Sequence, residues 1–210
     1  GNNNIAQPIV VDGTHVFMSA GYGKGCGLVE VSQTDGEFSA KLIWENKRLK
    51  NKFTSSVLHE GHIYGLDSSG DDNTGGGNGA NLVCLKALTG DEVWRGENYG
   101  HGQLLLAQGH LIIQCEKGDL ALVKATPKSH QLIARIPALS GKTWNNPALA
   151  GGRLYVRNDR EMICYDIRPG SEAGVPTART HAPEGLAILL AAFLLMNGVG
   201  LLGTGMANRG

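Results

Sequence analysis

The sequence predicts an all-β protein: a β-propeller of four-stranded antiparallel blades, about three and a half of them, followed by a C-terminal hydrophobic helix. Glycine is abundant, with 31 of the 210 residues, whereas aromatic residues make up only 6%. Short apolar runs alternate with glycine turns, and one such phrase returns four times. Without a G-X-Y period, this pattern is typical of a turn-rich β protein and not of collagen or a disordered chain.

The first half of each repeat is a predicted β-hairpin. Its four copies read PIVVDGTHVFM from Pro8, SSVLHEGHIYG from Ser55, QLLLAQGHLII from Gln103 and PALAGGRLYVR from Pro147. Their spacings are 47, 48 and 43 residues when they are aligned on Val16, Ile63, Leu111 and Leu154. In each copy a glycine turn joins two apolar runs, because glycine accepts the positive φ that a tight hairpin requires.

A second strand–turn–strand phrase follows each of these hairpins. Its copies read GLVEVSQTDGEFSAKLIW, NLVCLKALTGDEVW, GDLALVKATPKSHQLIARI and the shorter EMICYDI. Two hairpins per repeat give four strands, which is the content of one propeller blade. Trp44 and Trp94 end the first two copies, and Ile136 is expected at the same position of the third. Since a blade buries its faces only against its neighbours, these indoles are expected to pack between blades.

The phrase LKALTGDEVW resembles the tryptophan-docking repeat of PQQ-like (quinoprotein-type) β-propellers, A-x-D-x-x-T-G-x-x-x-W. Thr89, Gly90 and Trp94 match this pattern, although a lysine stands where the family has its acidic residue. With the hairpin phrases, the resemblance covers residues 5–167. It implies a structural role for Trp44, Thr89, Gly90 and Trp94, which would dock one blade on the next.

Proteins of this family fall into two functional classes. Quinoprotein dehydrogenases hold PQQ and calcium and oxidise alcohols or sugars, whereas others, such as the propeller lipoprotein of the β-barrel assembly machinery, use the propeller as a docking surface. The dehydrogenases often carry a disulfide between adjacent cysteines. The four cysteines of this chain are far apart and are expected to be buried thiols: Cys26, Cys84, Cys115 and Cys164.

The resemblance therefore implies a non-catalytic scaffold for protein–protein interaction in the cell envelope, on its periplasmic or extracellular side and without a cofactor. A fragment of a PQQ-dependent dehydrogenase, whose quinone and calcium ligands lie mainly in other blades, is the alternative. No catalytic or cofactor-binding residue is assigned, and neither H-E-x-x-H nor G-x-S-x-G occurs. His62 and His110 recur at one turn position in successive repeats, which is typical of exposed turn residues.

The loop DSSGDDNTGGGNGAN, between the two hairpins of the second repeat, contains the only candidate metal ligands, Asp71, Asp72 and Asn73. Their oxygen atoms suit a hard cation such as calcium. Their spacing departs from D-x-[DN]-x-[DN]-G with its distant glutamate, however, and consecutive glycines make an ordered loop entropically costly. A mobile insertion is therefore favoured over a calcium loop.

The segment ENKRLKNK is the only basic cluster of the chain, and it follows Trp44 directly. Because blade-to-blade connections line one face of a propeller, Lys47, Arg48, Lys50 and Lys52 are predicted to form an interaction surface for an acidic partner. A solvated connecting loop is the alternative. The chain as a whole balances 19 Lys and Arg against 19 Asp and Glu, which argues against a nucleic-acid partner.

The composition changes abruptly after Ile167, which divides the chain into blades (1–167), a Pro- and Gly-rich linker (168–185) and a hydrophobic segment (186–207). The last segment is uncharged and, as a helix, would be about 33 Å long, enough to cross a bilayer core. A membrane anchor is favoured here. A buried helix of a larger protein and a reading-frame error are the alternatives.

Overall fold

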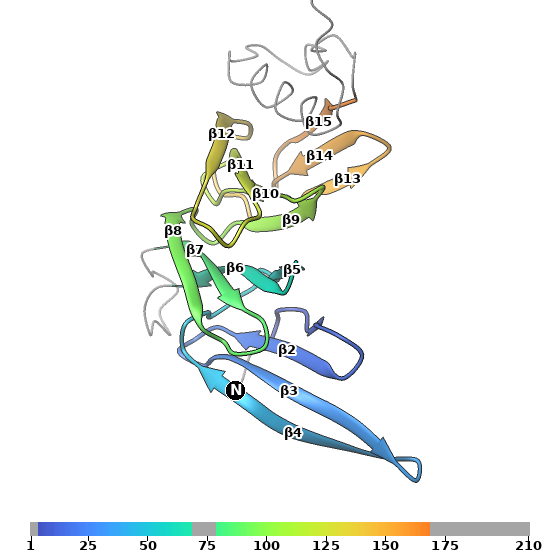
Figure 1. Cartoon of the computed structure of the whole chain (residues 1–210). Helices are drawn as coiled ribbons and strands as arrows, with labels where there is room; N and C mark the ends of the chain where they lie inside the picture. The colour runs from blue at the N-terminus through green and yellow to red at the C-terminus, as the bar shows by residue number, and fades with distance from the viewer. Residues whose placement is uncertain (1–3, 69–78, 169–210) are drawn as a thin grey trace, which may run out of the picture.

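The structure, a computed structural model, describes residues 4–68 and 79–168. Within these residues all the regular secondary structure is β-strand, and the strands form four antiparallel sheets. Three sheets have four strands and the last has three, and each sheet keeps its strands in chain order. The sheets follow one another along the molecule, with the first and the fourth at opposite ends (Figure 1). The predicted succession of antiparallel blades is therefore confirmed for these residues.

The strand bounds define the four blades. Blade 1 contains β1 (Ile9–Val10), β2 (His15–Ala20), β3 (Gly25–Thr34) and β4 (Glu37–Asn46). Blade 2 contains β5 (Val57–His59), β6 (His62–Ser68), β7 (Ala80–Lys86) and β8 (Glu92–Asn98). Blade 3 contains β9 (Gln103–Ala107), β10 (His110–Gln114), β11 (Asp119–Lys124) and β12 (Leu132–Pro137). Blade 4 contains β13 (Ala148–Ala150), β14 (Arg153–Arg157) and β15 (Met162–Asp166).

The strand register confirms the repeat alignment. The four residues used to align the repeats are each the second residue of the second strand in their blade: Val16, Ile63, Leu111 and Leu154. The pairing of the third and fourth strands is also interrupted by a bulge at one equivalent place in the first three blades, directly after Leu28, Cys84 and Leu122. The blades are thus equivalent residue by residue, which allows their faces to be compared.

Tight turns join the first and second strands of blades 2 and 3. Glu60 and Gly61 have φ values of 47° and 73°, and Gln108 and Gly109 have 47° and 71°. Two successive positive φ values are typical of the hairpin turn whose twist matches that of the strands it joins. In both blades the histidine after the turn places Nδ1 2.8 Å from the carbonyl oxygen two residues earlier. The recurrence of His62 and His110 therefore has a local structural cause.

Three apolar clusters fill the seams between consecutive blades. One joins blades 1 and 2, for example Phe17 and Leu28 with Ile63. The next joins blades 2 and 3, and the last joins blades 3 and 4. The middle strands of blades 2 and 3 are almost wholly buried because each of their faces lies against another blade. Burial of these apolar faces is the main force that holds the blades in sequence.

The two tryptophans of the docking repeat lie at these seams. Trp44 packs 6.0 Å from the ring of Phe17 and lies against the Gly90 turn of blade 2. Trp94 donates a hydrogen bond from Nε1 to the carbonyl oxygen of Thr126 in blade 3, at 2.9 Å. Its ring centroid lies 5.8 Å from that of His130. Each indole thus reaches from the fourth strand of one blade to the last turn of the next.

The expectation that Ile136 replaces tryptophan in blade 3 is wrong. Trp44 pairs with Leu28 and Trp94 with Cys84, and the equivalent residue of blade 3, Leu122, pairs with Ala134. Ile136 lies two residues further along and pairs with Leu120. The turn between β11 and β12 is longer than that of blade 2, so counting residues from the turn does not give the position of the fourth strand.

Gly90 allows a specific test of the seam between blades 1 and 2. Its φ is +71°, and a Cβ atom there would lie 2.6 Å from Trp44 Cε3. Gly36 has a similar φ of +88° but no atom within 4 Å of the same position. Gly36→Ala should therefore cost only the backbone strain, about 1 kcal/mol. Gly90→Ala should lower the free energy of unfolding by about 2 to 4 kcal/mol, because the new methyl group also displaces the indole of Trp44.

The measurement is the urea midpoint of both variants by circular dichroism. Equal losses for Gly90→Ala and Gly36→Ala would contradict the close packing of the turn on Trp44.

Candidate functional site

The blade connections gather at one end of the stack. In an antiparallel meander the chain leaves the fourth strand at the end where the second strand turns into the third. The connections 47–56, 99–102 and 138–147 therefore share one face with the turns 21–24, 115–118 and 158–161. We call this the connection face. It holds the predicted basic cluster and a group of aromatic residues that the sequence did not predict.

The four predicted interaction residues differ in accessibility. Lys47 and Arg48 are exposed, Lys50 is half-buried, and Lys52 is buried with 4% of its surface accessible. Arg48 donates from Nη1 to the carbonyl oxygen of Gly90 at 2.9 Å, and Lys52 Nζ lies 5.4 Å from the ring centroid of Tyr22. The alkyl stems and charges of this segment therefore help to join blades 1 and 2. Their role in binding a partner stays a prediction.

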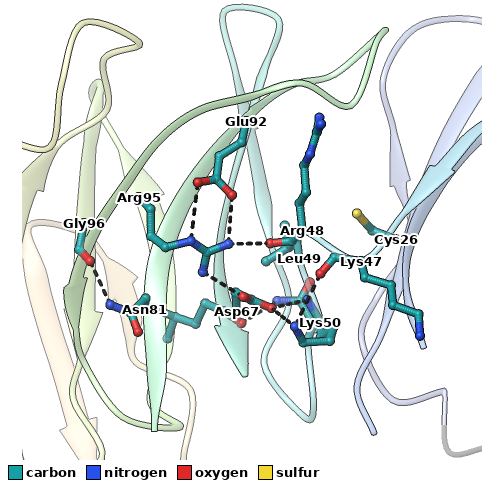
Figure 2. A network of polar contacts seen from close by, with 12 residues as sticks. Cys26, Lys47, Arg48, Leu49, Lys50, Asp67, Asn81, Glu92, Arg95 and Gly96 are labelled. Atoms are coloured by element: carbon teal, nitrogen blue, oxygen red, sulfur yellow. Dashed lines mark hydrogen bonds and ion pairs between the residues drawn. The ribbon is translucent and has the colours of Figure 1, made fainter. Parts of the chain in front are cut away.

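Asp67 organises the interior of this junction (Figure 2). Its side chain is only 5% exposed, and Oδ2 accepts from Arg95 Nη1 at 2.7 Å. Oδ1 accepts from the backbone N–H of Lys50 at 2.8 Å and lies 3.3 Å from Lys50 Nζ. Arg95 also donates to Glu92 and, at 3.0 Å, to the carbonyl oxygen of Arg48. Blade 2 thereby holds the connection that arrives from blade 1.

The pKa of Arg95 reflects these contacts. Partial burial of the guanidinium acts to lower it, but the hydrogen bonds to Glu92 and Asp67 outweigh burial and raise the pKa above its ordinary value. Arg95 is therefore a permanent cation in the junction. With two acidic partners fixed around it, its role is to hold the chain in place.

An aromatic cluster lies on the connection face where three connections meet. Phe53 comes from the connection between blades 1 and 2, His101 from the next and Trp144 from the last. The Phe53 ring centroid lies 4.7 Å from Trp144 and 5.8 Å from His101. Gln103 Nε2 donates to the carbonyl oxygens of Phe53 and Trp144, at 3.1 and 3.2 Å. One buried amide thus fixes the two connections that carry the rings.

Glu116 holds this cluster from the turn between β10 and β11. Its Oε1 accepts from Trp144 Nε1 at 3.0 Å, and its Oε2 accepts from the backbone N–H of His101 at 2.9 Å. Burial alone would raise the pKa of Glu116, but these two hydrogen bonds, with the charges of His101 and Lys142, hold it below its ordinary value. Glu116 is therefore ionised at neutral pH and orients the indole of Trp144.

Trp144 presents its indole to solvent, with 42% of its surface exposed. Lys142 Nζ lies 3.3 Å from the ring centroid, a cation–π contact. An exposed indole held by hydrogen bonds on a rigid support loses little conformational entropy when a partner covers it. Tryptophan is also among the residues that contribute most at protein interfaces. The arrangement is suited to docking a segment of another protein.

Sequence reasoning missed Phe53, His101 and Trp144, because they lie far apart in the chain and outside the strands. One signal was present. In LSGKTW a glycine is followed by a tryptophan, in the connection that leads into blade 4. This phrase is similar to the T-G-x-x-x-W phrase that identified Trp94, but it lies between blades and not within one.

The candidate metal ligands Asp71, Asp72 and Asn73 lie outside the described residues. Across 4–68 and 79–168, no group of three or more His, Cys, Asp or Glu side chains is placed to hold a metal ion. The predicted hydrophobic segment 186–207 also lies outside these ranges. Among the residues that are described, no helix is long and apolar enough to cross a membrane.

The cysteines are all free thiols, and three of the four are buried as expected. Burial raises the pKa of Cys26 and Cys115 to about 12 and that of Cys84 to about 11. These three groups are therefore protonated and unreactive at neutral pH. Cys164 differs from the expectation, because it is exposed on β15, on the face of blade 4 turned away from blade 3.

A scan against protein-family models found no match, and neither did a search of curated proteins. Solved structures do show similar arrangements. BamB from Moraxella catarrhalis is 13% identical with a TM-score of 0.38, over 77% of this chain and 58% of that one. Hsv2 from Kluyveromyces lactis is 13% identical with a TM-score of 0.46, over 86% and 51%.

A europium-containing methanol dehydrogenase is 14% identical with a TM-score of 0.43, over 64% of this chain and 25% of that one. The chain spans less than two thirds of the length of each of these three proteins. These likenesses concern the arrangement of the strands alone.

Proposed function

We propose that this chain is a non-catalytic β-propeller scaffold that binds a protein partner through its connection face. The observation that carries the proposal is the exposed indole of Trp144, which Glu116 and Lys142 hold in one orientation on a support built from three connections. Binding would cover this indole and the neighbouring edge of Phe53. A rigid set of blades that displays such a platform can bind without any catalytic group.

The exposed charges of this face suggest the chemistry of the partner. The connections and turns of this face contribute six exposed cations and two exposed anions. The cations are Lys24, Lys47, Arg48, Lys117, Lys142 and Arg160, and the anions are Asp159 and Glu161. An acidic segment that carries an apolar or aromatic residue would pair with these cations and cover the indole. The predicted interaction residues Lys47 and Arg48 would then steer association, while Lys50 and Lys52 support the surface from within. The location in the cell envelope and the membrane anchor remain part of this proposal.

Site-specific photo-crosslinking in cells tests the docking role. A photoreactive residue in place of Lys117, which is exposed on the turn next to Glu116, should give a discrete adduct with one protein. Trp144→Ala should lower the adduct yield at least tenfold, because a central interface tryptophan contributes about 2 kcal/mol or more. Phe38→Ala is the matched control, since Phe38 is 72% exposed beside the turn between β3 and β4, at the end of β4 opposite the connection face.

The urea midpoint of Trp144→Ala, measured alongside, should stay within about 1 kcal/mol of the wild-type stability. An unchanged adduct yield in Trp144→Ala, with Phe38→Ala behaving identically, would refute the docking role of the indole.

A further inference from the structure

We propose that the hairpin of β5 and β6 binds a divalent transition-metal ion through His59 and His62. These two residues flank the tight turn of blade 2, which reads His59-Glu60-Gly61-His62. Imidazole is a ligand that suits zinc, copper and nickel ions. The turn lies at the end of the blade opposite the connection face, so the proposal does not depend on the docking role of that face.

The register of the hairpin places the two histidines side by side. His59 pairs directly with His62 across the antiparallel strands. Directly opposed side chains point to the same face of the sheet, with their Cβ atoms about 5 Å apart. Two nitrogen atoms bound to one tetrahedral zinc ion, each at about 2.0 to 2.1 Å, lie about 3.3 Å from each other. Rotation of the His59 ring brings its nitrogen within this separation of the His62 ring.

His62 is held in the orientation that a metal ligand requires. Its Nδ1 lies 2.8 Å from the carbonyl oxygen of Glu60. Because a carbonyl oxygen only accepts hydrogen bonds, Nδ1 carries the hydrogen, and Nε2 of the neutral ring presents its lone pair. Histidines that bind metal ions commonly donate their other ring N–H to a backbone carbonyl, which fixes the ring and raises its basicity. The turn supplies this supporting contact within blade 2 itself.

The surroundings of His59 leave room for a cation. Its Nε2 lies 3.9 Å from Oε1 of the exposed Glu60, which places a negative charge beside the ring. A Cβ atom on Gly109, in the equivalent turn of blade 3, would lie 3.6 Å from the same nitrogen. Since glycine has no side chain, that turn keeps the space beside Nε2 open. Lys86, the neighbour of His62 on β7, is exposed, and its long stem carries the ammonium group into solvent.

Blade 3 contains half of the same arrangement. His110 follows the equivalent turn, and its Nδ1 lies 2.8 Å from the carbonyl oxygen of Gln108. The cross-strand partner of His110 is Ala107, however, where blade 2 has a second histidine. The site is therefore assigned to blade 2 and not to blade 3. It is a pair of ligands, and water completes the coordination, which makes it an exchangeable site and not a closed structural one.

Calorimetric titration of the full chain with zinc chloride at neutral pH tests the site. His59→Gln and His62→Gln should each weaken the binding of one zinc ion by about tenfold or more, because even loss of an outer contact to a metal ligand typically costs that much. His110→Gln is the matched control and should bind this ion as the wild type does, since it removes a histidine with the same turn geometry and no paired histidine.

A stability measurement keeps the test independent of folding. His59→Gln leaves the contact of His62 with the Glu60 carbonyl in place, so its urea midpoint without zinc should match that of the wild type. Zinc should raise the midpoint of the wild type and of His110→Gln, because the ion binds the folded pair, and should not raise that of His59→Gln. Three results would each overturn the proposal: wild-type affinity weaker than about 1 mM, equal affinity in His59→Gln and the wild type, or an equal loss of affinity in His110→Gln.

Discussion

Replacing Trp94 with alanine should lower the free energy of unfolding by about 3 to 5 kcal/mol, the usual cost of removing a large packed aromatic side chain. The indole fills the seam between blades 2 and 3, where it lies 5.9 Å from the ring of Tyr64 and 5.8 Å from that of His130. Its Nε1 also satisfies the carbonyl oxygen of Thr126. The variant therefore loses packing and a hydrogen bond together, and the blades on both sides of the seam are affected.

Urea denaturation followed by circular dichroism measures this loss. Trp94→Phe separates the loss of packing from the loss of the hydrogen bond, because phenylalanine keeps most of the ring contact and lacks the N–H donor. Loss of the donor should lower the free energy of unfolding by about 1 kcal/mol, in addition to the change in packing. Trp144→Ala is the matched control for a tryptophan that is exposed and does not fill a seam. Similar losses for Trp94→Ala and Trp144→Ala would contradict the seam role of Trp94.

Replacing Asp67 with alanine should lower the free energy of unfolding by about 3 kcal/mol or more. This carboxylate is 5% exposed and lies beside two cations, Lys50 and Arg95. Removal of one partner from a buried ionic group leaves the remaining charges desolvated without compensation, which is more costly than the net value of the pair. The backbone N–H of Lys50 would also lose its acceptor. The connection from blade 1 to blade 2 should then loosen.

Asp91 supplies the matched control for this prediction. It forms an ion pair with Arg48 at 3.6 Å across the same seam, but its side chain is 57% exposed. Solvent screens an exposed pair, so Asp91→Ala should be nearly neutral. The difference between the two variants should persist at high salt, because ions screen a buried network far less than a surface pair. Comparable losses for Asp67→Ala and Asp91→Ala would show that Asp67 is not a buried anchor.

The sequence predicted the blades because their signals are local. A glycine turn between two apolar runs specifies a hairpin, and recurrence of the Val16, Ile63, Leu111 and Leu154 positions gave the correct alignment of all four blades. The position of the fourth strand in blade 3 was predicted wrongly. Its register depends on the length of the preceding turn and on a bulge, and neither is visible in the spacing of apolar residues.

The connection face was harder to predict, for two physical reasons. The basic segment was visible as a run of charge, but the burial of Lys52 and the contact of Lys50 with Asp67 depend on how two blades meet. The cluster of Phe53, His101 and Trp144 arises only when three connections converge. Sequence spacing carries no information about that convergence, whereas the structure places the three rings together directly.

The seam between blades 2 and 3 is tested most directly by a double-mutant cycle on Trp94 and His130. The two residues belong to different blades, and their rings meet edge to face. Trp94→Ala, His130→Ala and the double variant, measured by urea denaturation, should show a coupling energy of about 1 kcal/mol, because removal of one ring abolishes the contact for both. Losses that add within about 0.3 kcal/mol would mean that the indole does not reach the neighbouring blade, and the seam described here would be incorrect.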